Sequence, residues 1–256
     1  MGFDLSTFSL KGKSAIITGG ASGLGEYYTK AMLKVGAQVL VVSRTTKGWQ
    51  QLKGDVGSNE ENLRFFQQDI TAKEAPDAIV AEALKDFGKI DILVNNAGMQ
   101  LRNEWQDFKD EDWQKVVNLN LNSVYYLSHA VAKEMAKQKF GKIINIGSMQ
   151  SFRAGKFIFP YTASKHGVVG LTKAYADALA PDNIQVNALA PGYINTPMTK
   201  ALQEDPVRSK EILAHIPAGH WADPQELMGA VVFLASAASD YITGVTLPVD
   251  GGYLLR

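Results

Sequence analysis

The sequence contains no cysteine, and this absence excludes disulfide bonds, thiolate metal sites and catalysis by a thiol. It also lacks an excess of charge of either sign, because 26 basic residues balance 26 acidic ones. No basic segment is interleaved with aromatic residues, so neither a nucleic-acid partner nor an anionic membrane surface is indicated. Any anionic ligand must therefore be held by a local group of cations.

Long hydrophobic runs are missing as well. No window approaches about 18 apolar residues, the length needed for a membrane-spanning helix. The first residues, MGFDLSTFSLKGKS, lack the basic segment, apolar core and small-residue cleavage site of a secretory signal. Together with the absence of cysteine, these features predict a soluble, cytoplasmic protein with no membrane partner.

What the sequence does contain is an alternation of short apolar runs with longer amphipathic stretches. Seven runs have the length of a strand, and the four stretches with helical length and spacing cover residues 26–35, 72–87, 110–138 and 162–180. Because parallel strands require crossover connections, the alternation predicts one α/β domain over residues 1–256, with a doubly wound, mostly parallel sheet flanked by helices. Ligands of such sheets bind at the carboxyl ends of the strands.

Residues 195–224 are the least regular part of the chain. Four prolines and several charged residues interrupt the alternation there. We expect this segment to be mobile and to cover the substrate. A plain surface insertion is the alternative interpretation.

A glycine-rich segment, TGGASGLG, follows the first predicted strand and opens the first predicted helix. In this position Gly19, Gly23 and Gly25 permit a tight turn, a close approach of the backbone to a pyrophosphate, and packing of the helix against the strand. Backbone amides at the start of the helix, near Ser22 and Leu24, would face the phosphates. The segment predicts a dinucleotide site, and the alternative is a glycine-rich turn without a ligand.

The end of the second predicted strand bears on the choice between NAD(H) and NADP(H). An acidic residue there would bind the ribose hydroxyls and repel a 2′-phosphate, but the sequence has Ser43 and Arg44. A guanidinium can bind phosphate through charge-assisted hydrogen bonds, so Arg44 favours NADP(H). If Arg44 instead stacks on the adenine or faces water, NAD(H) serves.

Three further segments at strand ends complete the predicted cofactor site. An aspartate after the third strand would accept a hydrogen bond from the adenine amino group or cap the next helix. NNAG follows the fourth strand and leaves room for a flat ligand; the alternative is that it only forms a turn. PGYINTPM follows the sixth strand and would position the nicotinamide. The expected residues are Asp69, Ile70, Asn96, Ala97, Gly98, Pro191, Gly192, Ile194 and Thr196.

A tyrosine and a lysine four positions apart, Tyr161 and Lys165, supply the chemistry. On a helix they share one face, so the lysine ammonium can lie beside the phenol and close to the cofactor. The pKa of a tyrosine, ordinarily about 10, must fall towards neutrality for proton exchange with a carbonyl oxygen. One cation about 4 Å away supplies roughly the required energy. Ser148, which ends the fifth predicted strand, would hydrogen-bond the substrate oxygen or cap a helix.

Further polar residues are candidates for catalysis. Asn120 lies in a predicted helix, where asparagine is unfavourable, so a role such as holding a water that relays protons to Lys165 is indicated. Asn118 and Asn122 fit the same argument. The four histidines have no suitably spaced acidic partners, and no metal site is predicted.

The ordered set TGGASGLG, NNAG, Asn120, Ser148, Tyr161 with Lys165, and PG after the sixth strand resembles the short-chain dehydrogenase/reductase family over nearly the whole chain. The resemblance implies a seven-stranded Rossmann sheet and usually a homotetramer. It also implies that Asn120, Ser148, Tyr161 and Lys165 form the catalytic tetrad, which decides among the three asparagines.

Within that family, NNAGMQLRNEW, GKIINIGSMQSF and the ending VDGGYLLR are similar to 2-dehydro-3-deoxy-D-gluconate 5-dehydrogenases and gluconate 5-dehydrogenases. This implies a keto sugar acid from uronate breakdown as the small-molecule substrate, and hence cations near the tetrad. Some such relatives use NAD without an acid after the second strand, which weakens the argument for NADP. The candidate substrate residues are Arg102, Ser148, Gln150, Arg153 and Lys156, with solvated surface cations as the alternative for the basic three.

The resulting hypothesis is an NAD(P)-dependent oxidoreductase that transfers a hydride between nicotinamide and a ketone or secondary alcohol of a keto-deoxy sugar acid. One alternative is a 3-oxoacyl-carrier-protein-type ketoreductase of the same family, which would need a basic patch for the carrier. The other is a nucleotide-sensing module without catalysis, but such modules typically lose a tetrad residue.

Overall fold

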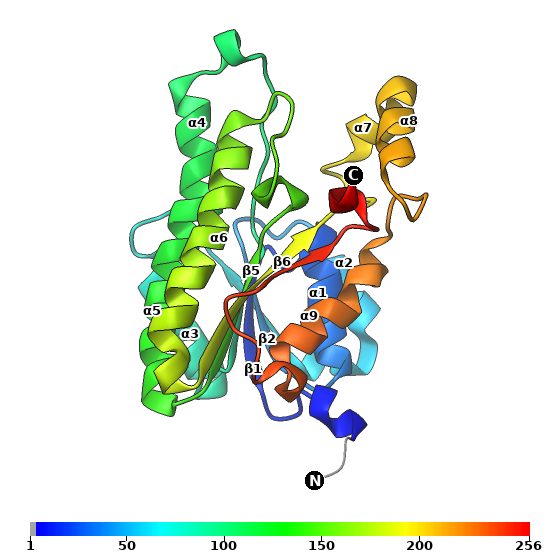
Figure 1. Ribbon diagram of the computed structural model, residues 1–256. Coiled ribbons are helices and arrows are strands. Elements are labelled where there is room, and N and C mark those ends of the chain that lie inside the picture. The colour runs from blue at the N-terminus through cyan, green and yellow to red at the C-terminus, as the bar shows by residue number, and fades with distance from the viewer. Residues whose placement is uncertain (1–3) are drawn as a thin grey trace.

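A single parallel sheet forms the centre of the molecule in the computed structural model, which describes residues 4–256 (Figure 1). The first three residues of the N-terminal segment lie outside this range. Seven strands pair in the order β3-β2-β1-β4-β5-β6-β7, and every pair is parallel. The strands are β1 (Ser14–Thr18), β2 (Gln38–Ser43), β3 (Leu63–Gln67), β4 (Ile92–Asn95), β5 (Gly141–Ile146), β6 (Ile184–Pro191) and β7 (Thr246–Val249). The predicted Rossmann-type α/β fold is confirmed.

Helices cover both faces of this sheet, because each crossover between parallel strands places a helix on one face or the other (Figure 1). The first face is covered by α1 (Gly23–Lys34), α2 (Trp49–Val56) and α9 (Met228–Ala235). The second is covered by α3 (Ala75–Phe87), α5 (Ser123–Gln138) and α6 (Phe159–Leu179). Beyond the strand ends lie α4 (Asp110–Val117), α7 (Lys200–Glu204) and α8 (Pro206–His215).

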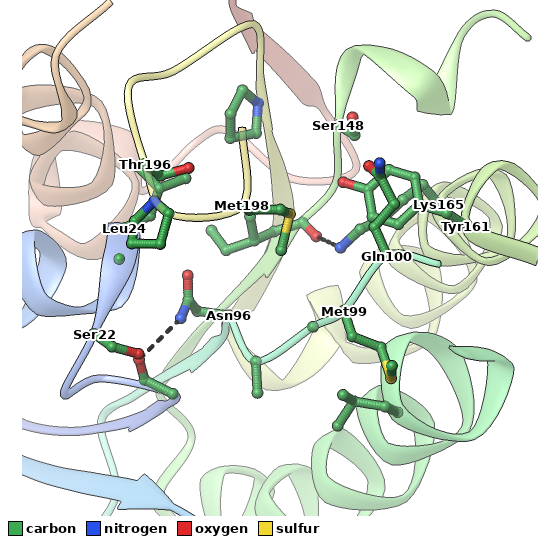
Figure 2. A pocket seen from close by; sticks show the side chains of 18 of the residues that line it. Ser22, Leu24, Asn96, Met99, Gln100, Ser148, Tyr161, Lys165, Thr196 and Met198 are labelled. Atoms are coloured by element: carbon green, nitrogen blue, oxygen red, sulfur yellow. Dashed lines mark hydrogen bonds between the residues drawn. The ribbon is translucent and has the colours of Figure 1, made fainter. Parts of the chain in front are cut away.

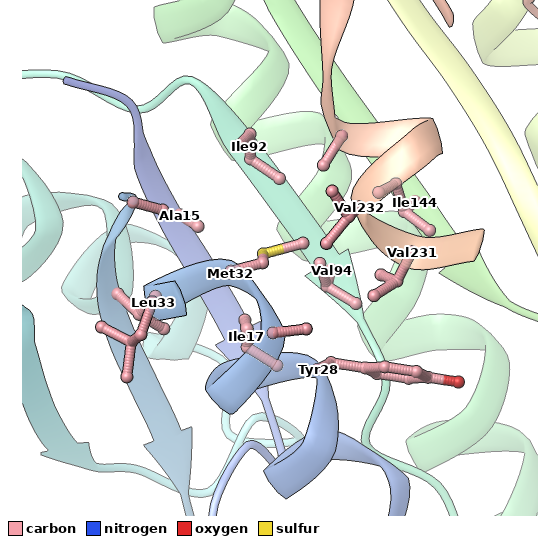
Figure 3. Packing of buried hydrophobic residues seen from close by; sticks show 14 of the residues in the cluster. Ala15, Ile17, Tyr28, Met32, Leu33, Ile92, Val94, Ile144, Val231 and Val232 are labelled. Carbon is pink, nitrogen blue, oxygen red and sulfur yellow. The ribbon is translucent and has the colours of Figure 1, made fainter. Parts of the chain in front are cut away.

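The strand residues supply the core for both faces. Ile17 packs with Tyr28 and Met32 of α1 on the first face (Figure 3), whereas the adjacent Ile16 packs with Ile79 of α3 on the second. Alternating side chains of a strand point to opposite faces, so a strand covered on both sides reads as a continuous apolar run. This explains why the strands of this chain were recognisable as short apolar runs.

The largest departure from the expected helices concerns residues 110–138, which were predicted as one stretch. A π-helical turn, Asn118–Asn122, separates α4 from α5. Single π-helical turns inside helices often mark functional positions, and this one contains Asn120. The irregular segment 195–224 contains α7 and α8. Within residues 4–256, no helix is both long and apolar enough to cross a lipid bilayer.

Candidate active site

A cavity of about 870 Å³ opens at the carboxyl ends of the strands. Segments that follow β1, β2, β4, β5 and β6 line it, as expected for a doubly wound sheet. Figure 2 shows Ser148, Tyr161 and Lys165 on one side of the cavity, and Ser22, Leu24 and Thr196 on the opposite side. Residues that are far apart in the sequence therefore meet around one space.

The glycine-rich segment forms the turn between β1 and α1. Gly19 and Gly23 have φ angles of 66° and 55°, a region in which glycine is free of steric cost. Gly25 is buried, and a Cβ at this position would lie 2.3 Å from the Gly19 carbonyl oxygen and 2.5 Å from Asn96 Nδ2. Asn96 Nδ2 also donates to the Thr18 carbonyl at 2.9 Å. The loop and the NNAG turn are thus locked together, and only glycine fits between them.

The start of α1 is available to an anion. Ser22 occupies the N-cap position, yet its side chain makes no capping hydrogen bond. The first amides of a helix have no partner within the helix and carry its positive dipole end. Since Ser22, Gly23 and Leu24 all line the cavity, these amides fit the pyrophosphate of a dinucleotide.

The far end of the cavity is lined by Ser43, Arg44 and Lys47, which follow β2. Lys47 was missed by the sequence analysis, although a second cation three positions after Arg44 was a visible signal. Asp69 lines this end too, and its carboxylate accepts hydrogen bonds from the backbone amide and the hydroxyl of Thr71 at 2.9 and 2.7 Å. Hydrogen bonding from Thr71 lowers the pKa of the Asp69 carboxyl. Asp69 therefore forms a local turn with Thr71 and does not cap α3, whose N-cap residue is Glu74, and its role towards the adenine stays a prediction.

Ser148, Tyr161 and Lys165 come together because β5 ends beside the first turns of α6. Ser148 is 7% exposed, and its Oγ accepts a hydrogen bond from the Gln150 amide at 3.1 Å. Ser151 Oγ donates to the Lys165 carbonyl at 2.9 Å, which ties the turn after β5 to α6. Ser148 is therefore both the N-cap residue of the short helical turn that follows and a residue that lines the cavity.

The ammonium of Lys165 does not acidify the phenol in the way that we expected. Lys165 Nζ donates to the Ile146 carbonyl at 2.6 Å and lies 5.6 Å from the centroid of the Tyr161 ring. Burial lowers the pKa of Lys165 to about 8, and burial also raises the pKa of Tyr161, with hydrogen bonding to Ser148 acting in the opposite direction. Removal from water favours the neutral form of each group, so in this arrangement the pKa of Tyr161 is raised where the sequence analysis expected it to fall.

Asn120 is fully buried and does not line the cavity. Its Oδ1 accepts from the Met99 amide and its Nδ2 donates to the Met99 carbonyl, both at 2.9 Å. Nδ2 also lies 3.3 Å from Ser164 Oγ, on α6. The side chain therefore fixes the segment after NNAG against α6, and its amide is already occupied by these contacts.

The candidate substrate residues separate into two groups. Gln150 and Arg102 line the cavity, whereas Arg153 and Lys156 do not. The Arg153 guanidinium lies 4.9 Å from the centroid of the Tyr253 ring, and the Lys156 side chain is exposed. Gln150 is 7% exposed, and its Oε1 has no hydrogen-bond partner among the described residues.

The predicted cofactor residues, apart from the buried Gly25, all line the cavity. Several further residues line the cavity, of which Tyr193, Pro197 and Met198 lie within PGYINTPM, the segment expected to position the nicotinamide. They are Met99, Gln100, Lys115, Tyr193, Pro197, Met198, Thr199 and Leu202. Four of these belong to residues 197–202, so part of the irregular segment does face the site. Among residues 4–256, no three His, Asp or Glu side chains are grouped as metal ligands.

A model of the family described as short chain dehydrogenase matches residues 13–207, and the chain belongs to this family. The 2-dehydro-3-deoxy-D-gluconate 5-dehydrogenase of Bacillus subtilis is 45% identical over 260 residues, with 100% of each chain covered. The crystal structure of a gluconate 5-dehydrogenase from Burkholderia cenocepacia, in complex with NADP and tartrate, is 38% identical with a TM-score of 0.93, and 98% of this chain and 99% of that chain are covered. A 3-oxoacyl-acyl-carrier-protein reductase of Vibrio cholerae is 38% identical over 244 residues, which cover 95% of this chain and 98% of that protein. The chain is an NAD(P)-dependent dehydrogenase that acts on CH-OH groups.

Proposed function

We propose that this enzyme interconverts a ketone and a secondary alcohol of a keto-deoxy or keto hexonate, as in the 2-dehydro-3-deoxy-D-gluconate 5-dehydrogenases and gluconate 5-dehydrogenases that it resembles. The observation that carries the proposal is the presence of two polar groups in the cavity that Tyr161 also lines. Gln150 offers a buried, unpartnered carbonyl oxygen, and Arg102 offers a guanidinium at the cavity wall. A substrate hydroxyl satisfies the first group and a carboxylate satisfies the second.

The roles of the protein groups follow from their positions. When bound, the nicotinamide cofactor supplies or accepts the hydride. Tyr161 donates a proton to the carbonyl oxygen during reduction and withdraws it during oxidation. The Ser148 hydroxyl hydrogen-bonds the same oxygen, and Lys165 lies on the same face of α6, beside Tyr161. Because the Gln150 backbone amide donates to Ser148 Oγ, the two residues are fixed side by side, and a substrate hydroxyl bound to the Gln150 side chain would bring the ketone towards Ser148.

A direct comparison of substrates tests this function. The initial rates of oxidation of 2-dehydro-3-deoxy-D-gluconate and of reduction of 5-keto-D-gluconate should exceed the rate of reduction of an acetoacetyl thioester. Preference for the thioester would instead support the carrier-protein ketoreductase. Cofactor binding without turnover of any substrate would support the nucleotide-sensing module.

NADP(H) is the cofactor that we propose, because Arg44 and Lys47 line the adenosine end of the cavity and no carboxylate follows β2. Replacing Arg44 with Ala should raise KM for NADPH by about 10-fold, the effect of one hydrogen bond to a charged group, and leave KM for NADH unchanged. Steady-state kinetics with each cofactor measure this difference. An equal rise for both cofactors would show that Arg44 stacks on the adenine instead.

The rate of alcohol oxidation should rise with pH. Burial raises the pKa of Tyr161, so the phenol stays protonated at neutral pH and the phenolate needed for oxidation is scarce. Between about pH 7 and about pH 10, kcat/KM for oxidation should increase, whereas kcat/KM for ketone reduction, which uses the protonated phenol, should stay level or fall. Parallel pH profiles in the two directions provide the test. An oxidation rate that falls over this range would contradict the role of Tyr161 as the base.

The homotetramer and the cytoplasmic location stay predictions from the sequence, as does the covering role of residues 195–224. Tyr125 and Tyr126 on α5 are 41% and 56% exposed, and the start of α6 adds Phe159 at 46%. Exposed aromatic side chains of this kind support contact with other copies of the chain.

A further inference from the structure

The segment that follows β6 turns two backbone groups of Ile194 to the same side. Its neighbours along the chain pair with Ala222 instead: the Asn195 amide donates to the Ala222 carbonyl at 2.8 Å, and the Ala222 amide donates to the Tyr193 carbonyl at 3.1 Å. In a parallel pairing of this kind, the residue between the two bonded neighbours points its own amide and carbonyl away from the partner. The amide and carbonyl of Ile194 are therefore both directed to the side opposite Ala222.

The hydroxyl of Thr199 lies on that side and holds the segment in place. Its donor contacts are the Ile194 carbonyl at 2.5 Å and the Thr196 carbonyl at 3.1 Å, and the first is the closer. Its oxygen accepts from the Thr196 amide at 3.2 Å and from Gln203 Nε2 at 3.0 Å. Thr199 is the N-cap residue of α7, yet its side chain makes no capping hydrogen bond. The hydroxyl therefore serves the loop and not the helix.

Two polar groups of this loop are left for a ligand. Within residues 4–256, the Ile194 amide donates to no backbone or side-chain oxygen. The Thr196 hydroxyl has only the contact with Thr199 Oγ1 at 3.3 Å, and a hydroxyl has one hydrogen and two lone pairs, which the other partners of Thr199 already use. Ile194 and Thr196 line the cavity, and Figure 2 shows Thr196 across it from Tyr161. A carboxamide, with a carbonyl acceptor and an amide donor, matches this pair.

We propose that Thr199 is a positioning residue for the nicotinamide. By holding the Ile194 carbonyl and the Thr196 amide, its hydroxyl directs the Ile194 amide and the Thr196 hydroxyl at the carboxamide, and Gln203 ties this arrangement to α7. The inference rests on the NAD(P) dependence of the family and on the predicted role of Ile194 and Thr196 towards the nicotinamide. It does not depend on which substrate is reduced.

The test compares NADPH with 2′-phospho-ADP-ribose, in which a hydroxyl replaces the nicotinamide. Thr199→Val exchanges the hydroxyl for a methyl group of similar size. It should raise the Kd of NADPH by about 5-fold or more, the effect of losing one hydrogen bond, and leave the Kd of 2′-phospho-ADP-ribose unchanged. At saturating NADPH, kcat should fall by up to about 100-fold, because a displaced ring is no longer aligned for hydride transfer. Titration calorimetry measures both Kd values, and NADH with ADP-ribose gives the same comparison.

Matched variants separate positioning from folding. Thr199→Ser keeps the hydroxyl and should restore the Kd of NADPH and kcat. Thr7→Val makes the same exchange in the turn Leu5–Phe8, whose residues do not line the cavity, and should change neither quantity. An unchanged Kd of NADPH in Thr199→Val, or an equal loss of affinity for both ligands, would overturn the assignment of Thr199.

A further variant examines the premise. Thr196→Val should also weaken NADPH and spare 2′-phospho-ADP-ribose, and wild-type affinity for NADPH in this protein would overturn the inference by removing the contact through which Thr199 acts. Failure of the wild-type enzyme to use any sugar acid would instead overturn the proposed function and leave the Kd values as they are. The two failures are therefore distinguishable.

Discussion

Replacing Tyr161 with Phe should lower kcat by about 10²- to 10⁴-fold in both directions, the range that a positioned general acid or base contributes. The substitution removes only the hydroxyl, whose predicted partner is the carbonyl oxygen of the substrate. The ring would still fill its place beside Lys165, which lies over it at 5.6 Å. The Kd of NADPH should therefore change little. Steady-state kinetics and a fluorescence titration of the cofactor measure the two quantities separately.

The matched control is Tyr126→Phe, which removes a phenol from an exposed position of α5. Its kcat should equal that of the wild-type enzyme. Substantial activity in Tyr161→Phe would show that another group supplies the proton. Loss of cofactor binding along with activity would show that the phenol has a structural role in the cavity instead.

Replacing Gly25 with Ala should damage both stability and cofactor binding. The added Cβ would lie 2.3 Å from the Gly19 carbonyl oxygen, a backbone atom that cannot rotate away. Overpacking of this kind costs about 1–3 kcal/mol in the free energy of unfolding, which corresponds to a Tm lowered by about 2–12 °C in a chain of this size. Because the loop that must shift carries the amides at the start of α1, the Kd of NADPH should rise by at least about 10-fold, as for the loss of one hydrogen bond to a charged group.

Gly54→Ala provides the control for this experiment. Gly54 lies within α2, and a Cβ there would meet nothing within 4 Å. Alanine is favoured over glycine in a helix by about 1 kcal/mol, so Tm should be unchanged or slightly raised and the Kd of NADPH unaffected. Thermal unfolding followed by circular dichroism compares the three proteins. A Gly25→Ala protein with the Tm and Kd of the wild type would refute the close packing of the glycine-rich turn against NNAG.

The pattern of apolar residues was sufficient to predict all seven strands, because the strands at the centre of the sheet are buried on both faces and are therefore rich in apolar side chains. The run QVLVVS coincides with β2, and IQVNAL falls within β6. Helices were predicted less well. The stretch 110–138 reads as one amphipathic helix, and the break at Asn118–Asn122 has no proline or glycine to announce it. Contacts of Asn120 with Met99 and Ser164, which are distant in the sequence, accompany the break.

The sequence by itself determined the groups that carry the chemistry, since a phenol and an amine four residues apart on a helix, and glycines between a strand and a helix, are constrained by local geometry. Tertiary structure alone decided the pKa of Tyr161 and which residues line the cavity. The pKa of Tyr161 depends on how much water the folded chain excludes from the phenol, and no local pattern records this. In the same way, Arg102 and Gln150 are far apart along the chain and line one cavity only because the segments after β4 and β5 meet at the same edge of the sheet.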